Sequence, residues 1–375
     1  MRTVKLLIFP LDLDTADAFI RVSRALGIET VGASSVMSDR GGKAVDGFVK
    51  LPFVTDPAFD AALHKTLREY SITAVYAPHQ GVWRHLDTLL KTNPDFGFSL
   101  CKPDPFTETR QIFGPHDDWA ASTAQPRALA VFAGCQTPRP ALASSSYAAL
   151  HRQFLNTPGQ CDETKLQALC DITRVLPAGD VVEVGCLYGR SAFALGFLAN
   201  RHKLGSLVCI DPWNIGDLTD QGPQAAVLNA EGAGIDFDKI FRIFLSTAAL
   251  LDNVGYIRTT SESAMPVYEA ARRAGELHSA ELGRITLTEH LSLVHIDGNH
   301  RYDHVSKDVD IWSPYLAPGG WLLLDDYEWA FGDGPRRVGD ELRNSPLYDS
   351  AFVSGGTLFL RRTDDKSQSV RRPRT

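Results

Sequence analysis

The sequence Val181-Val-Glu-Val-Gly-Cys-Leu-Tyr-Gly-Arg-Ser191 predicts a buried strand, a glycine turn and the start of a helix. The apolar strand carries Glu183 near its end, Gly185 and Gly189 form the turn, and the helix begins at Ser191. Glycine lets the backbone bend tightly and approach a ligand closely. The spacing is Gly-x-x-x-Gly, not the Gly-x-Gly-x-x-Gly of dinucleotide sites, so we expect a bound group without a pyrophosphate.

A second acidic residue ends the next predicted strand, at 206–210. Asp211 lies 22 positions after Gly189 (211 − 189), close to the ~20 expected of a carboxylate that binds a ribose. Acidic residues also suit a ligand with ammonium and sulfonium charges, so we expect S-adenosyl-L-methionine here. Ser261, after the following strand, is either an adenine contact or a helix N-cap. The predicted cofactor-binding residues are Glu183, Gly185, Gly189, Ser191, Asp211 and Ser261.

The second half of the chain alternates strand and helix patterns. We predict strands at 181–184, 206–210, 256–259, 291–296 and 321–324, and helices at 146–155, 163–176, 191–201, 266–273, 304–312 and 336–343. Two β-rich runs, 351–354 and 357–361, are expected to close the domain as an antiparallel pair. This α/β pattern resembles the Rossmann-like sheet of class I methyltransferases.

Three aspartates and a histidine follow two of these strands. Asp297 ends one strand and His300 comes three positions later, while Asp325 and Asp326 end the next strand. Ligand sites of open parallel sheets form at the carboxyl ends of strands, so these residues and the glycine turn are expected to share a crevice. Carboxylates this close repel one another unless a proton or a cation neutralises them. Oxygen donors without a thiolate favour Mg²⁺, or Mn²⁺, over Zn²⁺.

On these residues, the segment from Val181 to Asp326 resembles the metal-dependent O-methyltransferases of macrolide sugars, the macrocin and mycinamicin type. The broader family includes cephalosporin hydroxylase-like proteins. In that family an Asp-x-x-His element and a later Asp-Asp pair hold Mg²⁺ and supply the base. Both elements are present, beginning at Asp297 and Asp325, 28 positions apart (325 − 297). The resemblance covers roughly residues 145–362.

The resemblance implies an enzyme in which Asp297, Asp325 and Asp326 bind Mg²⁺ and His300 is the catalytic base. The metal would lower the pKa of an acceptor hydroxyl, and His300 would take its proton, because imidazole titrates near neutral pH. The oxyanion would then attack the sulfonium methyl group in line. The expected acceptor is the hydroxyl of a small molecule, a sugar, diol or catechol, in secondary metabolism.

Residues 1–125 predict a smaller α/β domain, with strands at 4–9, 29–33, 48–51 and 74–77 and helices at 15–26, 58–70 and 82–91. Such repeats predict a parallel, doubly wound sheet, and their order resembles the domain that precedes ATP-grasp modules. The first turn, Pro10-Leu-Asp-Leu-Asp14, has no glycine-rich phosphate loop. We therefore expect an auxiliary role in packing, dimerisation or covering the other domain's site.

The composition shifts along the chain and suggests four segments. The auxiliary domain at 1–125 is followed by a linker with one helix at 126–160, which is rich in Pro, Ala and Ser. The class I methyltransferase domain then covers 161–362, and a basic tail covers 363–375.

The overall composition excludes several protein classes. A content of 44% hydrophobic and 22% charged residues is typical of globular proteins, and a net charge of −7 argues against nucleic-acid binding. The apolar runs are too short to span a bilayer, so no membrane partner is expected. Six cysteines without a CxxC pair favour a reduced, cytoplasmic protein. The oligomeric state is left open, a homo-oligomer included.

Two segments near the expected site are candidates for substrate selection. The insertion at 214–253 contains a helical run at 240–251, as lids often do. Tyr327, Trp329 and Phe331 follow the acidic pair, where aromatic rings suit a sugar or an aromatic acceptor; ordinary loop packing is the alternative. A further insertion at 276–288 is predicted to be helical.

Three other functions remain open at this point. A hydroxylase or oxidoreductase on the same scaffold would bind NAD(P)H, against which the Gly-x-x-x-Gly spacing speaks. An N-methylating member would share all the motifs. A non-catalytic binding protein would have no need of the complete acidic cluster.

Overall fold

The computed structural model describes residues 4–125, 138–214, 220–231 and 234–364. The chain divides into two compact units, Met1–Pro115 and His116–Thr375, each of which is described by itself. Parts of the expected linker and tail, residues 126–137 and 365–375, lie outside the described residues, as do 215–219 and 232–233 of the long insertion.

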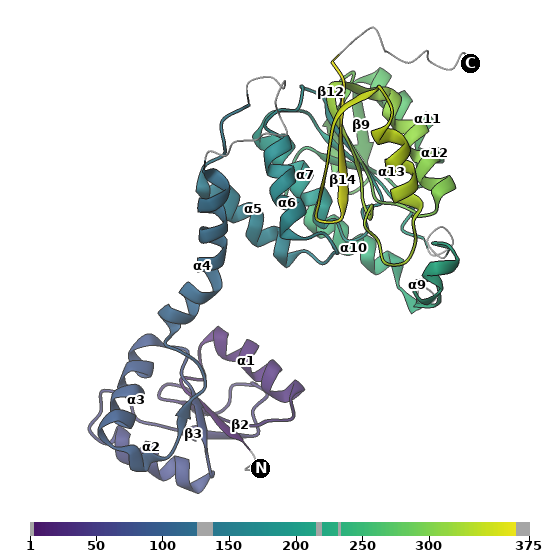
Figure 1. The fold of residues 1–375 in the computed structure, drawn as a ribbon. Helices are drawn as coiled ribbons and strands as arrows, with labels where there is room; N and C mark the ends of the chain where they lie inside the picture. The colour runs from purple at the N-terminus through teal and green to yellow at the C-terminus, as the bar shows by residue number, and fades with distance from the viewer. Residues whose placement is uncertain (1–3, 126–137, 215–219, 232–233, 365–375) are drawn as a thin grey trace. The chain divides into compact units, whose positions relative to one another are not determined.

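The N-terminal unit contains a five-stranded parallel sheet in the order β3-β2-β1-β4-β5 (Figure 1). Its strands are short and apolar, and its helices turn an apolar stripe toward the sheet. The strands are β1 (Lys5–Ile8), β2 (Glu29–Ser34), β3 (Gly47–Lys50), β4 (Ala74–Tyr76) and β5 (Ser99–Leu100); the helices are α1 (Asp14–Ala25), α2 (Phe59–Glu69) and α3 (Gln80–Thr92). The prediction of an α/β fold for this segment is confirmed.

Two elements of this region are not predicted by the sequence pattern. β5 has only two residues, too few to show a strand pattern. The helix α4 (Pro105–Ala124) contains Pro115 in its interior, where proline normally breaks a helix because it lacks an N–H donor and crowds the preceding turn. The helix nevertheless continues through Pro115.

The C-terminal unit is built on a seven-stranded sheet in the order β13-β14-β12-β11-β6-β7-β8 (Figure 1). The five strands β12, β11, β6, β7 and β8 run parallel, whereas β14 is antiparallel to β12 and to β13. The strands are β6 (Asp180–Val184), β7 (Leu207–Ile210), β8 (Val254–Ile257), β11 (Leu291–Ile296), β12 (Leu316–Leu324), β13 (Tyr348–Ser354) and β14 (Thr357–Arg362). The prediction of a Rossmann-like sheet closed by an antiparallel pair is confirmed.

Helices pack on both faces of this sheet because its parallel strands are apolar on both sides. One buried cluster joins the sheet to α5 (Ser144–Asn156), α6 (Glu163–Ile172), α7 (Arg190–Arg201) and α10 (Phe237–Ala248). The other joins it to α11 (Ser261–Ala274), α12 (Tyr302–Trp312) and α13 (Gly334–Arg343). A short helix, α9 (Ala226–Glu231), lies in the long insertion.

The prediction of a helix at 276–288 is wrong. This segment is an antiparallel hairpin of β9 (Glu276–Ser279) and β10 (Gly283–Thr286), in which burial alternates with the period of a strand. The hydroxyl of Ser279 accepts a hydrogen bond from the backbone N–H of Tyr256 at 2.8 Å and donates to its carbonyl at 3.0 Å. The hairpin thus covers the edge of β8, a tertiary contact that helical propensity does not register.

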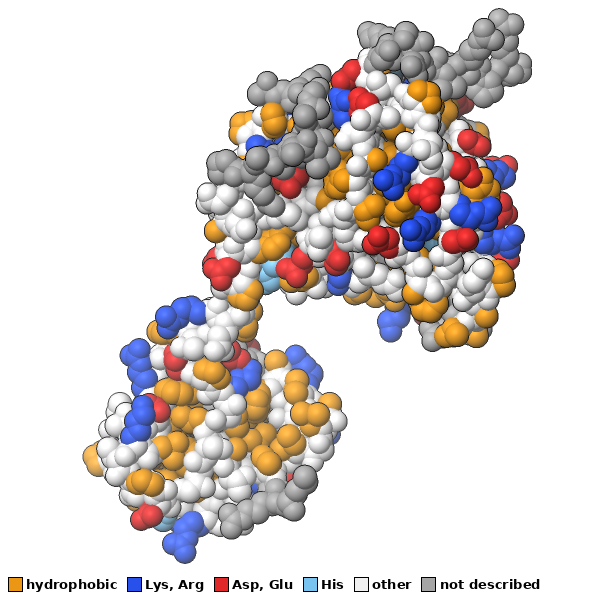
Figure 2. Space-filling view, viewed as in Figure 1, with side chains coloured by type: hydrophobic (Ala, Val, Ile, Leu, Met, Phe, Trp, Pro, Cys, Tyr) orange, Lys and Arg blue, Asp and Glu red, His pale blue; other side chains and the backbone are white. Residues whose placement is uncertain are grey.

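The surface differs between the two units. In Figure 2, hydrophobic side chains form a broad area on the visible face of the N-terminal unit, whereas acidic and basic side chains are interspersed over the region of α11 to α13. Within the described residues, every helix is either too short or too polar to cross a lipid bilayer.

Candidate active site at the carboxyl edge of the large sheet

The glycine turn after β6 lies directly against the first aspartate of the acidic cluster. Gly185 has a positive φ of 83°, and a Cβ atom on it would stand 2.0 Å from the carbonyl oxygen of Asp297. No residue with a side chain fits this position, since both the backbone conformation and the space exclude it. The turn and Asp297 therefore converge, as the sequence predicts.

The second turn glycine has a similar constraint. Gly189 has a φ of 89° and precedes α7, and a Cβ on it would stand 2.9 Å from the ring of Phe244 in α10. The helix of the long insertion thus packs on the turn. Ser191 is nearly buried in the first turn of α7.

Asp211 holds the glycine turn in shape. Its Oδ2 accepts hydrogen bonds from the backbone N–H groups of Cys186 and Leu187 at 2.8 and 2.9 Å, and its Oδ1 accepts one from Trp213 at 2.7 Å. The side chain is 3% exposed. The carboxylate therefore organises the turn itself, and the ribose contact predicted for it stays a prediction.

Two other predicted cofactor residues have partners inside the protein. Glu183 is fully buried, its Oε1 lies 2.8 Å from Nδ1 of His295, and its Oε2 has no hydrogen-bond partner among the described residues. Ser261 accepts a hydrogen bond from the indole of Trp312 at 2.8 Å, and the N-cap of α11 is Thr260. The N-cap interpretation of Ser261 is therefore wrong, and its adenine contact stays a prediction.

The acidic cluster forms at the ends of β11 and β12. Nε2 of His300 lies 3.7 Å from Oδ1 of Asp297 and 3.4 Å from Oδ2 of Asp326. Asp297 also contacts the carboxylate of Asp325. The three aspartates and His300 thus lie in one place, beside the glycine turn.

Lys165, which is not among the predicted site residues, reaches this cluster from α6. The side chain is 1% exposed, and its Nζ lies 2.6 Å from Oδ2 of Asp325 and 2.9 Å from Nε2 of His295. The sequence could have indicated the burial of Lys165, because Lys165, Leu169 and Ile172 lie on the same buried face of an amphipathic helix. A lysine on such a stripe needs a buried acidic partner.

Burial and charge shift the pKa values of the cluster in different directions. Burial, with the nearby charge of Asp325, raises the pKa of Asp297 well above its usual range and that of Asp326 to about 6. Burial alone would also raise the pKa of Asp325, but the charge and the hydrogen bond of Lys165 outweigh it and hold this pKa below its usual value. Burial lowers the pKa of His300 to about 4.

Three residues at this edge adopt a backbone conformation that side chains disfavour. Leu187 in the glycine turn has a φ of 45°, Trp213 after β7 has 41°, and Asp326 after β12 has 52°. Such strain costs of order 1–3 kcal/mol per residue and persists where the surrounding structure imposes it, as at ligand sites. All three residues flank the candidate site.

The aromatic residues after the acidic pair have different positions. The ring of Trp329 packs edge-on against His300 with a centroid distance of 4.5 Å and contacts Phe331, which is 38% exposed. Tyr327 is 5% exposed, and its hydroxyl donates to Asp340 of α13 at 2.5 Å. The placement of Tyr327 beside the metal is therefore wrong; Trp329 is the aromatic neighbour of His300.

Part of the long insertion binds the Asp-x-x-His element. The backbone N–H of His300 donates to Oε1 of Gln221 at 2.8 Å, and the side chain of Asn299 donates to the carbonyl of Asp220 at 2.8 Å. Arg301 forms an ion pair with Asp220. The insertion thus contributes to the wall of the site through residues 220–221.

The residues present fit a divalent cation. Asp297, His300 and Asp326 each offer one ligand atom, and these atoms lie within 4.8 Å of one another. Both ring nitrogens of His300 are buried without a hydrogen-bond partner in the described chain, which leaves them available to a ligand. The thiol of Cys186 lies near Glu183, but burial raises its pKa well above the usual value, so it offers no thiolate.

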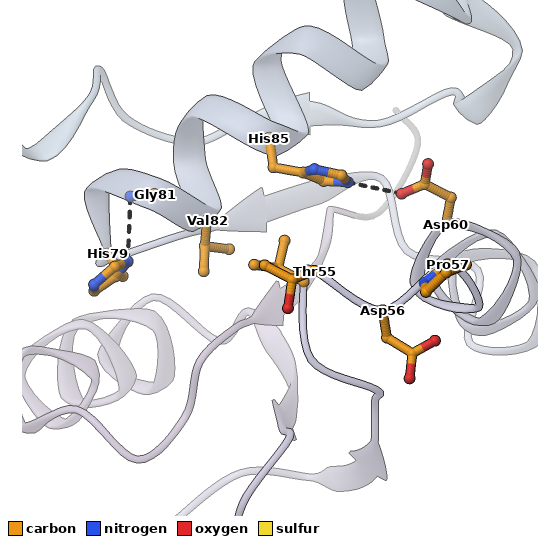
Figure 3. Close-up of a pocket in the computed structure, with 9 residues that line it drawn as sticks. Thr55, Asp56, Pro57, Asp60, His79, Gly81, Val82 and His85 are labelled. Carbon is orange, nitrogen blue, oxygen red and sulfur yellow. Dashed lines mark hydrogen bonds and ion pairs between the residues drawn. The ribbon is translucent and has the colours of Figure 1, made fainter.

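The N-terminal unit has a pocket of its own (Figure 3). A cavity of about 640 Å³ lies between the residues after β3 and the start of α3, and Asp60 and His85 pair across it at 2.7 Å. His79 accepts a hydrogen bond from the N–H of Gly81 at 3.2 Å. The charged residues that line this pocket are partly or fully exposed.

Residues 182–327 match the family model described as a methyltransferase domain. Among curated proteins, none matches the sequence. Similar solved structures include the O-methyltransferase NovP, with 16% identity, coverage of 53% of this chain and 79% of that chain, and a TM-score of 0.39. CalS11, a TDP-rhamnose 3′-O-methyltransferase of calicheamicin biosynthesis, has 15% identity, coverage of 73% and 86%, and a TM-score of 0.32. MycE of the mycinamycin pathway, solved with Mg, SAH and mycinamycin VI, has 15% identity, coverage of 50% and 46%, and a TM-score of 0.29.

Likenesses to structures at this level say nothing about the substrate of this chain. The matched segment, by contrast, contains the glycine turn, the Asp-x-x-His element and the acidic pair. Since these stand at the carboxyl edge of a seven-stranded α/β sheet, residues 182–327 are a methyltransferase domain of the S-adenosylmethionine-dependent class I type.

Proposed function

We propose that this enzyme transfers a methyl group from S-adenosylmethionine to a hydroxyl of a small molecule, with the help of Mg²⁺. One observation carries the proposal: Asp297, His300 and Asp326 meet next to the glycine turn at Gly185. This brings a divalent-cation site and a cofactor turn together at one strand edge, and metal-assisted methyl transfer needs both.

Each of these residues has a proposed task. Asp297 and Asp326 would hold the cation, which supplies Lewis-acid polarisation of the acceptor hydroxyl. His300 would accept the proton through a ring nitrogen that has no hydrogen-bond partner in the described residues. Burial lowers its pKa to about 4, so the imidazole is neutral at pH 7. Glu183, Gly185, Gly189, Ser191, Asp211 and Ser261 remain the proposed lining of the cofactor site.

The acceptor is proposed to be a sugar, a diol or a catechol of secondary metabolism. Trp329 next to His300 and the partly exposed Phe331 offer aromatic faces on which a sugar ring or an aromatic ring can pack. Two adjacent oxygens on the acceptor would suit a shared cation.

A product-formation screen tests the proposal. The enzyme is incubated with S-adenosylmethionine, Mg²⁺ and a panel of sugars, diols, catechols and amines, and S-adenosylhomocysteine is measured. Formation with hydroxyl acceptors that stops in excess EDTA supports it. Full activity in EDTA would overturn the role of the metal. Turnover of the amines alone would overturn O-methylation. Affinity for NAD(P)H without affinity for S-adenosylmethionine would favour an oxidoreductase.

A further inference from the structure

A buried cation contacts the acidic cluster from outside the segment that matches the methyltransferase family. Lys165 of α6 precedes that segment, is 1% exposed and forms an ion pair with Asp325 at 2.6 Å. Burial by itself would lower the pKa of Lys165, but Asp325 and neighbouring groups raise it above its usual value. The side chain is therefore an ammonium with three donors.

The hydrogen bonds of this ammonium assign donor and acceptor roles to the two ring nitrogens of His295. An ammonium cannot accept a hydrogen bond, so Nε2 of His295 accepts one from Lys165 at 2.9 Å. Nδ1 of His295 consequently carries the ring proton and donates it to Glu183 at 2.8 Å. The ion pair at 2.6 Å with Asp325 is made by Lys165.

The three aspartates differ in the number of hydrogen-bond partners that the protein gives their carboxylate oxygens. Both oxygens of Asp325 have protein partners, because Oδ2 accepts from Lys165 and Oδ1 accepts from the hydroxyl of Thr357. Asp297 contacts Asp325, and both Asp297 and Asp326 lie within 4 Å of Nε2 of His300, which has no hydrogen-bond partner in the described residues. Lys165 therefore compensates the charge of Asp325, which leaves Asp297 and Asp326 as the carboxylates that face a cation beside His300.

We propose that Lys165 is a positioning residue, which holds Asp325 out of the ligand shell so that one divalent cation binds between Asp297 and Asp326, beside His300. This rests on the proposed metal-assisted methyl transfer. It also revises the ligand set expected from the sequence, in which Asp325 is a ligand.

The charges predict an unusual response to loss of the lysine. In Lys165→Met, Asp325 becomes an uncompensated carboxylate next to Asp297, so a divalent cation should bind more tightly, by about tenfold or more. The cation would at the same time move toward Asp325 and away from His300, so kcat should fall. A lysine with a merely structural role would, when removed, weaken binding and turnover together.

The experiment is a Mn²⁺ titration, followed by the EPR signal of free Mn²⁺, on wild type, Lys165→Met, Asp325→Asn and the double variant. Asp325→Asn should bind Mn²⁺ roughly tenfold more weakly, because the charge of Lys165 is then unbalanced. The double variant removes both charges and should return to within about threefold of wild type. Because it contains no unpaired buried charge, it also remains informative if Lys165→Met does not fold.

Matched controls come from the exposed pair of Lys91 and Asp87 in α3. Lys91→Met and Asp87→Asn should leave Mn²⁺ binding unchanged. Binding of S-adenosylhomocysteine, measured by calorimetry, should be the same in every variant.

Two results would overturn the role of Lys165. The first is a double variant that binds Mn²⁺ about 100-fold more weakly than wild type, because Asp325 would then be a ligand. The second is a folded Lys165→Met variant that binds Mn²⁺ more weakly than wild type. Wild type that binds no Mn²⁺ would instead remove the metal from the proposed function itself. The cofactor half of that function is reported separately by the calorimetry.

Discussion

Glu183 and His295 are direct partners on the parallel strands β6 and β11, and their side chains bond at 2.8 Å on the face of the sheet that α6 covers. This buried pair lies beneath the acidic cluster and links the cofactor strand to Lys165. The register of β6 and β11 thus connects the strand of the cofactor turn with the strand that ends at the acidic cluster.

Asp297→Ala should lower kcat by about 10³-fold, since it removes a proposed ligand of the cation that activates the acceptor. Binding of S-adenosylmethionine, measured by calorimetry, should survive. Asp310→Asn on the exposed side of α12 is the control and should keep wild-type turnover. Wild-type turnover in Asp297→Ala would contradict the role of this residue.

Gly185→Ala should destabilise the protein by about 3 kcal/mol or more, because the new methyl group meets the carbonyl of Asp297 in a left-handed backbone conformation. Gly275→Ala is the matched control: its φ of 76° is similar, but open space surrounds it, so a loss of only about 1 kcal/mol is expected. Urea unfolding of both variants measures the difference. Equal losses would show that the close approach of turn and cluster does not exist in solution.

Mn²⁺ affinity should fall as the pH drops through about 6, the raised pKa of Asp326. The sign follows from burial, which favours the protonated acid: above this pH Asp326 is ionised and binds the cation, and below it a proton competes. The pKa of Asp297 is raised as well, so part of the effect should extend to higher pH. Each displaced proton contributes roughly tenfold in affinity per pH unit.

Calorimetry in two buffers with different ionisation enthalpies measures the protons released on Mn²⁺ binding. Release of one to two protons is expected near pH 6. An affinity that is flat between pH 5 and 8 would contradict the assignment of these carboxylates to the metal.

Trp329→Ala should raise the KM of the acceptor by about tenfold and leave the affinity for S-adenosylmethionine unchanged, since the ring packs against His300 and offers a face for the acceptor. Trp329→Phe retains an aromatic face and should lose much less. Steady-state kinetics with the acceptor found in the screen measures both. A change in the affinity for S-adenosylmethionine alone would contradict the contact of Trp329 with the acceptor.

Much of the site could be predicted from the sequence because its residues stand at the ends of apolar strands. Asp297, Asp325 and Asp326 terminate β11 and β12, and parallel strands present their carboxyl ends at one edge. The pattern could not show what each carboxylate does. Asp211 has the expected spacing, yet its carboxylate accepts hydrogen bonds from the backbone N–H groups of the glycine turn and of Trp213.

The sequence by itself determined most strands and helices of both units, the glycine turn and the acidic strand ends, because these follow from local pattern and chain direction. It did not determine β5, α4 or the hairpin of β9 and β10. Only the tertiary structure decided that Lys165 pairs with Asp325, 160 positions away, and that Tyr327 turns into the core while Trp329 meets His300. Such partners depend on how α6 and α13 pack on the sheet. The free energy of a buried charge is set by what lies beside it in space, and neighbours in the chain do not reveal that.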